Sequence, residues 1–381
     1  MSKTLLVSLV SDQTIPNVQL INEYGRQIDQ FLFISTQAME KKGVRQWIVN
    51  ACHLPGESLL PAVVVDQFSF DDIELQLDRI DFEAYGRIIV NLTGGTKVMT
   101  LAAFDFFKDL GAEIFYITGS DDRLIKLAPG RKKKTEVLAS RVGLTQYLQA
   151  YGFMLKETEP SPIGFEYTSR FFGMFARGIP ASFPEVMEYL RTRRSFETTD
   201  ISAFETLPDF LREIEFPKTS GILLKSEVKY LTGEWFEEYV AAKIKQELNL
   251  EEDQLKTGLV ITKKNREGVN IQNELDVVFI WENRIYTIEC KTSVFNPVVL
   301  PDGEIKTTSI MGETLYKVES LKQGFGLFAN ASLIMLDSLK ANGNRLKNHL
   351  DRAALYGIRV IDRDALEASD DISLLTGIKV S

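Results

Sequence analysis

The architecture of the amino-terminal part is indicated most clearly by residues 87–97, which read RIIVNLTGGTK. The first half of this stretch is apolar at consecutive positions, which is typical of a strand that is covered on both faces by helices. The two glycines then allow a tight turn. Apolar positions from Val98 to Phe106 follow with the spacing of a helix. A strand, a glycine turn and a helix therefore follow one another directly.

The same alternation of strand and helix runs through the first third of the chain. Strands are predicted over residues 4–10, 31–35, 61–65, 87–92 and 113–118, with helical patterns between them. We therefore expect an α/β fold over residues 1–150, with a Rossmann-like, doubly wound parallel sheet. In such sheets, ligands bind outside the carboxyl ends of the strands.

The pattern changes after residue 150. Residues 151–225 show no clear strand alternation, and we interpret them as a mainly helical connector. Its arginines Arg191, Arg193 and Arg194 could line a substrate cleft, although a solvated helical face is the simpler interpretation. Its aromatic run from Phe165 to Phe175 favours core packing at a domain junction over a surface on which bases stack.

A second α/β domain is predicted over residues 226–381. A helical pattern from Glu227 onward is followed by strand patterns over residues 258–262, 274–281 and 284–291. Two further pairs of helix and strand end near Ile361. Because the helical connector separates this region from the amino-terminal sheet, we expect it to fold around its own core.

Composition excludes several classes of function. The 381 residues include 44 Lys+Arg and 53 Asp+Glu, a formal net charge of −9, which argues against a protein that coats nucleic acid with a uniformly basic surface. Cys52 and Cys290 lie far apart, so no CxxC metal site or disulfide framework is expected. His53 and His349 are the only histidines. Any catalysis should therefore rely on carboxylates, lysine and hydroxyls.

The hydropathy of the chain bears on its location. No apolar run approaches the roughly 18 residues of a membrane span. The short apolar run at the amino terminus stops at Ser11 and Asp12, which is unlike a signal peptide. We therefore expect a cytoplasmic protein without a membrane partner.

Polar side chains gather at three of the predicted strand ends. The glycine turn combines an expected helix N-terminus with the donors Thr93, Thr96 and Lys97, which suit a phosphate group. The loop Ser11–Asn17 after the first strand and Thr36 after the second have the same character. Neither the GxxxxGK[ST] nor the GxGxxG spacing is present, so hydrolysis of a nucleoside triphosphate is not implied. The alternative is that these residues only form turns and helix caps.

A second candidate site lies in residues 273–291, which read NELDVVFIWENRIYTIECK and predict two strands around a tight turn. Placing the turn at residues 283–284 sets Asp276 opposite Lys291. Glu289 would then share the same face of the hairpin. Two carboxylates so close together repel each other and need a compensating charge, which Lys291 or a divalent cation supplies. The hairpin therefore predicts a Mg²⁺ or Mn²⁺ site.

Glu237 adds a third carboxylate to this region. It opens a predicted helix whose apolar stripe runs from Val240 to Leu248, so its side chain belongs to the apolar face. The alternative role for Glu237 is that of a structural partner for a lysine or a backbone amide. Glu234, one turn earlier, could also reach an adjoining cleft.

These motifs resemble two known families. Asp276, followed by Glu289-x-Lys291 and preceded by a helix with Gly-x-x-Phe-Glu, resembles the PD-(D/E)xK nuclease core. The strand end Asn-Leu-Thr-Gly-Gly-Thr-Lys resembles the CARF domain, which senses cyclic oligoadenylate. The chain as a whole resembles the ancillary nucleases of type III CRISPR defence, the Can/Card family, in which these two domains are joined. Leu275 stands where the nuclease motif usually has proline.

The resemblance implies roles for individual residues. Asp276 and Glu289 would bind Mn²⁺ or Mg²⁺, and Glu237 would complete the metal shell directly or through water. Lys291 would orient the attacking water. The residues implied to bind the activator, cyclic tetra-adenylate, are Ser11, Gln13, Thr14, Thr36, Asn91, Thr93, Gly94, Gly95, Thr96 and Lys97.

The resemblance also implies partners. Because a ring of four adenylates has two-fold symmetry and is too large for one strand-end pocket, two copies of residues 1–150 would form one site in a C2 homodimer. Ring binding would reposition the carboxyl-terminal domains and admit the substrate, which is supercoiled duplex DNA, single-stranded DNA or single-stranded RNA. Two other functions stay open: a ring-gated transcription regulator without nuclease activity, and a CARF domain that also degrades its ring.

Overall fold

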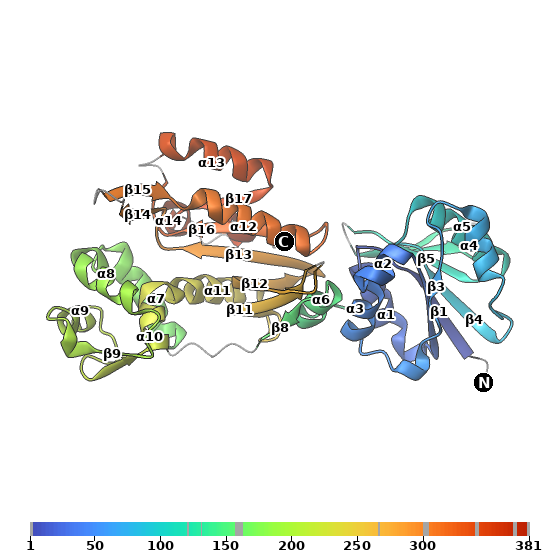
Figure 1. Cartoon of the computed structure of the whole chain (residues 1–381), viewed down its shortest axis with the longest axis horizontal. Helices are drawn as coiled ribbons and strands as arrows, with labels where there is room; N and C mark the ends of the chain where they lie inside the picture. Colours follow the sequence, from blue (N-terminus) through green and yellow to red (C-terminus); the bar gives the residue numbers. More distant parts are fainter. Residues whose placement is uncertain are drawn as a thin grey trace.

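The structure, a computed structural model, describes residues 3–119, 122–130, 132–156, 163–265, 267–299, 305–339, 343–368 and 372–378. Two α/β domains lie end to end along its long axis, the amino-terminal one on the right of Figure 1 and the carboxyl-terminal one on the left. Helices from residues 165–229 lie at the outer end of the carboxyl-terminal domain. The predicted order of sheet, helices and second sheet is confirmed.

The amino-terminal sheet has the strand order β3-β2-β1-β4-β5-β6-β7. Its strands are β1 (Lys3–Leu9), β2 (Gln30–Ser35), β3 (Val63–Val64), β4 (Tyr85–Asn91), β5 (Glu113–Ile117), β6 (Arg123–Ala128) and β7 (Lys134–Val137). Strands β1 to β5 pair in parallel, as predicted, and β6 and β7 add an antiparallel edge. The order reverses between β1 and β4, so the loops after these strands meet at the switch point, where ligands bind in such sheets.

Helices cover both faces of this sheet. They are α1 (Ile15–Tyr24), α2 (Gln37–Lys42), α3 (Val44–Ala51), α4 (Phe70–Leu77) and α5 (Lys97–Asp109). Leu5, Val7 and Leu9 of β1 pack with residues of α4 and α5, whereas Leu6 packs with residues of α1 and α3. Burial on both faces explains why the strand sequences are apolar at consecutive positions.

Helices predominate between the two sheets. They are α7 (Phe165–Ala176), α8 (Pro184–Arg193), α9 (Leu207–Glu213) and α10 (Lys225–Lys229), together with the short antiparallel pair β9 (Thr198–Asp200) and β10 (Ile222–Leu224). Tyr167 and Phe171 are buried, and the Phe171 ring meets Trp235 edge-on with centroids 4.9 Å apart. The interpretation of this aromatic run as core is therefore confirmed for these two residues.

The carboxyl-terminal sheet has the strand order β17-β16-β13-β12-β11-β8. Its strands are β8 (Met154–Leu155), β11 (Leu255–Lys264), β12 (Asn270–Trp281), β13 (Arg284–Lys291), β16 (Asn330–Met335) and β17 (Ile358–Ile361), and β14 (Phe295–Val299) and β15 (Ile305–Ser309) form a separate hairpin. Strands β11 to β13 are antiparallel, whereas β13, β16 and β17 are parallel. The predicted second α/β domain is confirmed.

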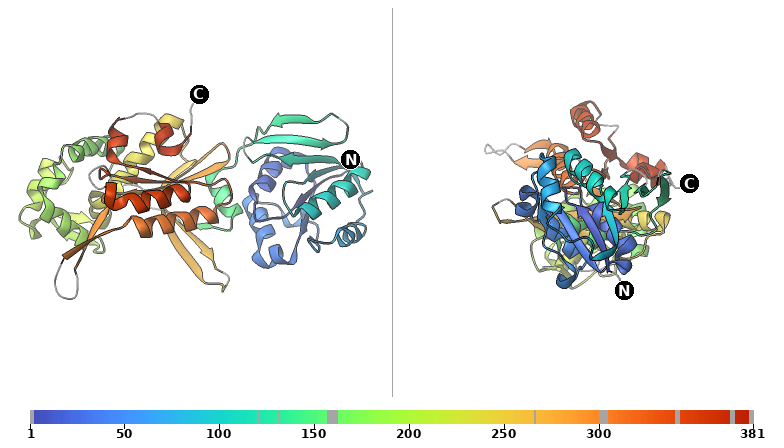
Figure 2. Two further views of the ribbon diagram at one scale, coloured as in Figure 1. Left: turned by 90° about the horizontal axis from the view of Figure 1, so that it is seen from above. Right: turned by 90° about the vertical axis from the view of Figure 1, so that its right-hand side faces the viewer.

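Helices pack on both faces of this sheet. They are α11 (Trp235–Leu248), α12 (Met311–Gly324), α13 (Gly343–Leu355), α14 (Arg363–Ala368) and α15 (Ile372–Thr376). The predicted stripe of α11 packs on Val277, Phe279 and Ile288. Residues of α12 pack on the opposite face, where Figure 2 shows α12 and α13 side by side across the sheet. The ends of α11 and α12 can therefore reach the same strand end from two sides.

The β12–β13 turn lies one residue earlier than predicted. Trp281 pairs with Arg284, so Glu282 and Asn283 form the turn, and the predicted position of Asp276 opposite Lys291 is wrong. Both turn residues are left-handed, with φ of 46° and 59°, which is the type I′ turn that matches the twist of paired strands. The pairing of β12 with β13 is therefore shifted by two residues from the predicted register. Because side chains alternate between faces with a period of two, Asp276, Glu289 and Lys291 still share one face.

Asn283 also connects the two domains. Its side-chain oxygen accepts a hydrogen bond from Val142 N at 2.7 Å, and its amide donates to Asp122 Oδ2 at 2.8 Å. The residue is only 5% exposed. The tip of the β12–β13 hairpin is therefore fixed to the end of the amino-terminal domain, near α6 (Leu144–Ala150).

Replacing Asn283 by alanine is expected to lower the free energy of unfolding by about 3 kcal/mol, because a buried N–H loses its partner and alanine is disfavoured in the left-handed conformation. Urea unfolding measures this loss. Asn283→Gly is the matched control, because glycine tolerates the conformation and the variant lacks only the side-chain hydrogen bonds. An Asn283→Ala variant as stable as the wild type would show that the turn does not hold the domains together.

Candidate functional site

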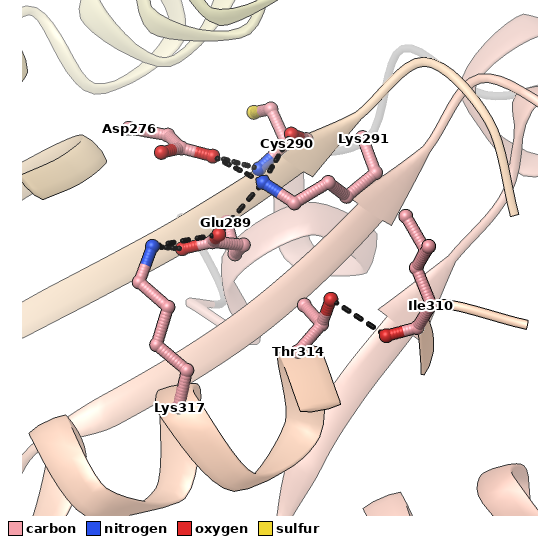
Figure 3. Close-up of polar contacts among 7 residues, drawn as sticks. All are labelled: Asp276, Glu289, Cys290, Lys291, Ile310, Thr314 and Lys317. Atoms are coloured by element: carbon pink, nitrogen blue, oxygen red, sulfur yellow. Dashed lines mark hydrogen bonds and ion pairs between the residues drawn. The ribbon is translucent and has the colours of Figure 1, made fainter. Parts of the chain in front are cut away.

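Three of the predicted catalytic residues meet at the end of the β12–β13 hairpin. Lys291 Nζ lies 2.7 Å from Glu289 Oε1 and 3.3 Å from Asp276 Oδ2 (Figure 3). Strand pairing ends at Val277 and Ile288, and beyond it Asp276 Oδ2 accepts a hydrogen bond from the Cys290 backbone N–H at 2.8 Å. The Asp276 carboxylate thus takes the place of a backbone acceptor beyond the last residue pair, and this hydrogen bond holds it against β13.

Burial strengthens the electrostatics of this group. Asp276 and Glu289 are 7% and 6% exposed. Loss of solvation raises the pKa of Asp276, and the negative charge of Glu289 raises it further. Burial would lower the pKa of Lys291, but its two carboxylate partners raise it above the usual range. Lys291 is therefore a cation in this structure. A further positive charge close to Asp276 and Glu289 would stabilise their ionised forms.

Lys317 of α12 supplies part of that charge. Its Nζ lies 2.8 and 2.9 Å from the two oxygens of Glu289 (Figure 3). Sequence reasoning missed this residue. The sequence shows a lysine on a helix that follows the Glu289-x-Lys291 strand. It does not show which face of that helix packs against the strand, because this depends on tertiary packing.

Glu237 adjoins the cluster without joining it. Burial raises its pKa well above the usual value, and the nearby charges of Asp276 and Glu234 raise it further. Within the described parts of the chain, no three acidic, histidine or cysteine side chains are close enough together to hold one metal ion. Direct and water-mediated contact of Glu237 with a metal both stay predictions. Glu234, the other candidate at the start of α11, forms an ion pair with Lys229, with 3.5 Å between Oε1 and Nζ.

The donors present suit a hard divalent cation. Asp276 and Glu289 offer carboxylate oxygens, and the Cys290 carbonyl faces the same space, since it accepts a hydrogen bond from Lys291 Nζ at 3.2 Å. A set made only of oxygen donors, some of them left to water, is what Mg²⁺ and Mn²⁺ prefer. The residues therefore fit the predicted metal.

The predicted ligand loops come together at the switch point of the amino-terminal sheet. Asn91 is fully buried, and its amide donates to Pro16 O at 3.0 Å and to Asn17 Oδ1 at 2.9 Å. Its oxygen accepts from Thr93 N at 3.1 Å. Asn91 thus connects the loop after β1 to the loop after β4, which makes it a positioning residue for the predicted ligand loops.

Backbone geometry explains the two glycines of the loop after β4. A Cβ on Gly94 would lie 2.4 Å from the Leu9 carbonyl oxygen and 3.3 Å from Ser11 Oγ. Gly95 has a φ of +78°, which side-chain-bearing residues rarely adopt. The turn can therefore form only with glycine at Gly94, and Ser11 lies beside it.

The threonine hydroxyls of the predicted ligand loops also stabilise the fold. Thr96 and Thr36 cap α5 and α2 by accepting from Met99 N and Met39 N, and Thr93 accepts from Ile117 N at 2.8 Å. The alternative interpretation as caps thus describes what these threonines do. Lys97, by contrast, is exposed at the first position of α5, and Thr14 is buried at the start of α1.

Gln13 connects the predicted ligand loop after β1 to the other domain. Its Oε1 accepts hydrogen bonds from Leu327 N at 3.0 Å and from Tyr151 OH at 3.3 Å. Leu327 lies in the turn between α12 and β16. A predicted ligand residue therefore contacts the turn at one end of the helix that carries Lys317.

Comparison with known proteins assigns both domains. Residues 5–147 match the model of the Card1 CARF domain, and residues 224–373 match that of the Card1-like endonuclease domain. No match to a curated protein was found. Within the described part of the chain, no helix has both the length and the apolar character needed to cross a membrane.

Three solved structures share the fold. Can2 from Sulfobacillus thermosulfidooxidans in complex with cyclic tetra-adenylate is 23% identical, with a TM-score of 0.68 over 97% of each chain. VC1899 from Vibrio cholerae is 19% identical, with a TM-score of 0.71 over 96% of this chain and 95% of its own. A type III CRISPR defence DNA nuclease activated by cyclic oligoadenylate is 17% identical, with a TM-score of 0.53 over 88% of this chain and 45% of its own.

Proposed function

Because the chain belongs to the CRISPR-associated nucleases that join a Card1-type CARF domain to a Card1-like endonuclease domain, we propose that it cuts nucleic acid when cyclic tetra-adenylate binds. The observation that carries the proposal is the buried cluster of Asp276, Glu289 and Lys291 in the endonuclease domain. The sensor in the same chain supports control by a nucleotide ring, and the Can2 complex supports a ring of four adenylates.

The cluster suits hydrolysis of a phosphodiester. A divalent cation held by Asp276, Glu289 and the Cys290 carbonyl would lower the pKa of a bound water and offset charge on the phosphate. Lys291, whose pKa is raised by its carboxylate partners, would donate hydrogen bonds to the attacking water or to a phosphate oxygen. Glu237 would hold a water at the edge of the site.

The ring would occupy the switch-point pocket of two chains. Lys97 and the N–H groups at the start of α5 offer positive charge and donors to phosphates, whereas Thr93, Thr96 and Asn91 maintain the shape of the loops. A two-fold symmetric ring favours a C2 homodimer with one composite site. DNA and RNA are both compatible substrates, and a cytoplasmic location stays a prediction.

Cleavage assays test this proposal. Labelled single-stranded DNA, single-stranded RNA and supercoiled plasmid are incubated with Mn²⁺ or Mg²⁺, with and without the ring. We expect cutting only when ring and metal are both present. Tight ring binding without cutting of any substrate would contradict the nuclease and favour the regulator.

Gln13 is expected to couple the pocket to the nuclease domain. Gln13→Ala removes the acceptor for the Leu327 N–H, so the ratio of cleavage with the ring to cleavage without it should fall about fivefold. Gln13→Glu is the matched control, because a carboxylate still accepts this hydrogen bond. Ring affinity is measured in parallel by calorimetry. A ratio that stays at the wild-type value in Gln13→Ala would show that this contact transmits nothing.

A further inference from the structure

A cavity of about 290 Å³ lies beside the catalytic hairpin, between the helical connector and the start of α11. Its walls include Phe175, Met187, Leu231 and Trp235, and Thr232 and Thr292 add hydroxyls. Arg191, exposed in the last turn of α8, also lines it. None of the functions assigned above uses this cavity.

The position of the cavity relates it to the reaction. Thr292 directly follows Lys291 in the chain, so the Cα atoms of these residues are about 3.8 Å apart. Trp235, which also lines the cavity, lies two residues before Glu237 in the chain. The cavity is therefore lined by residues from the two segments that carry the proposed catalytic residues, although none of those residues lines it.

The chemistry of the lining selects the kind of group. A mostly apolar and aromatic wall with two hydroxyls suits a planar ring with polar edges, and Arg191 adds a positive charge that complements a neighbouring phosphate. The lining contains no carboxylate, which argues against a cation. Pockets for drug-sized ligands have volumes of about 300 to 1,000 Å³, so a cavity of about 290 Å³ is suited to a group as small as one base.

Aromatic packing keeps the walls in place. Trp235 is 1% exposed, and its ring lies 4.9 Å from that of Phe171 and 5.2 Å from that of Phe175, measured between centroids. The neighbouring Arg193 does not line the cavity. Its guanidinium carbon lies 5.0 Å from the centroid of the Tyr189 ring. Arg191 is the arginine that lines the cavity, whereas Arg194 Nη1 lies 3.7 Å from the position of a Cβ on Gly233.

We propose that this cavity is a base subsite, which binds the unpaired base of a nucleotide next to the scissile phosphate, with Arg191 on the adjoining phosphate. The proposal rests on the proposed nuclease function. It assigns the helical connector a part in substrate binding, and it makes cleavage depend on a base at one position beside the cut.

Single-stranded oligonucleotides with one abasic position, moved stepwise along the strand, test the subsite. With ring and metal present, we expect an abasic position at one site beside the cut to lower kcat/KM about tenfold and the other positions to have little effect. Ala181→Trp places a ring at the exposed rim of the cavity. This variant should cleave intact oligonucleotide with a lower kcat/KM than the wild type. An abasic site at the same position should not lower its kcat/KM further.

Ala176→Trp is the matched control, because Ala176 is exposed on α7 outside the lining and should behave like the wild type. Equal tolerance of all abasic positions by the wild type would overturn the subsite. An equal abasic loss in Ala181→Trp and the wild type would do the same.

A binding measurement keeps this test separate from the nuclease proposal. Oligonucleotides with 2-aminopurine at successive positions are titrated with metal-free full-length protein and the ring. Quenching at one position in the wild type and Ala176→Trp, lost in Ala181→Trp, supports the subsite even if no cleavage is found. The absence of position-dependent quenching overturns it.

Discussion

Asp276→Asn is expected to lower kcat/KM for cleavage about a thousandfold, because the amide keeps the shape of the carboxylate but loses the charge that a divalent cation requires. The variant should fold, since its side-chain oxygen can still accept the hydrogen bond from the Cys290 N–H. Cleavage is measured with ring and metal at saturating concentration. Thermal unfolding of each protein verifies that the structure persists.

Asp253→Asn is the matched control for this result. Asp253 is exposed between α11 and β11, and the same chemical change there should leave cleavage at the wild-type level. If Asp276→Asn kept more than about a tenth of the activity, the hairpin would not be the metal site, because loss of a metal-binding carboxylate costs far more than tenfold.

Lys97→Ala is expected to weaken binding of cyclic tetra-adenylate by a factor of about 100 to 10,000. A hydrogen bond to a charged group contributes about 1.5 to 3 kcal/mol, and each composite site in a C2 dimer loses two of them. Nuclease activity at low ring concentration should fall in proportion, whereas saturating ring should restore it. Isothermal titration calorimetry measures the affinity directly.

Lys108→Ala provides the matched control, because Lys108 is exposed at the other end of the same helix. Its ring affinity should equal that of the wild type, and Lys97→Arg should retain most of the affinity because the charge remains. Wild-type affinity in Lys97→Ala, or an equal loss in Lys108→Ala, would show that the ring does not contact the start of α5.

The strands and helices could be predicted from the sequence because burial leaves a direct pattern. Consecutive apolar residues in β4 and β13 reflect cover on both faces, and the stripe of α11 reflects one buried side. The turn of the hairpin could not be placed with the same accuracy. Its position depends on left-handed conformations at Glu282 and Asn283 and on the contact of Asn283 with Asp122, a residue far away in the sequence.

The candidate site could be predicted only in part, for a related reason. Asp276, Glu289 and Lys291 lie on two consecutive strands, so spacing alone brings them together. Lys317 and Gln13 act through α12 and the turn that follows it, and their partners are set by how helices and domains pack. The predicted domain boundaries at residues 150 and 225 stay predictions.

The central claim is that one chain both senses the ring and cuts nucleic acid. It is tested most directly by following the cleavage of labelled single-stranded DNA and RNA by the wild-type protein with Mn²⁺, before and after cyclic tetra-adenylate is added. We predict no cleavage before the addition and rapid cleavage after it, which chelation of the metal stops. Cleavage at the same rate with and without the ring, or no cleavage at any ring concentration, would contradict the account.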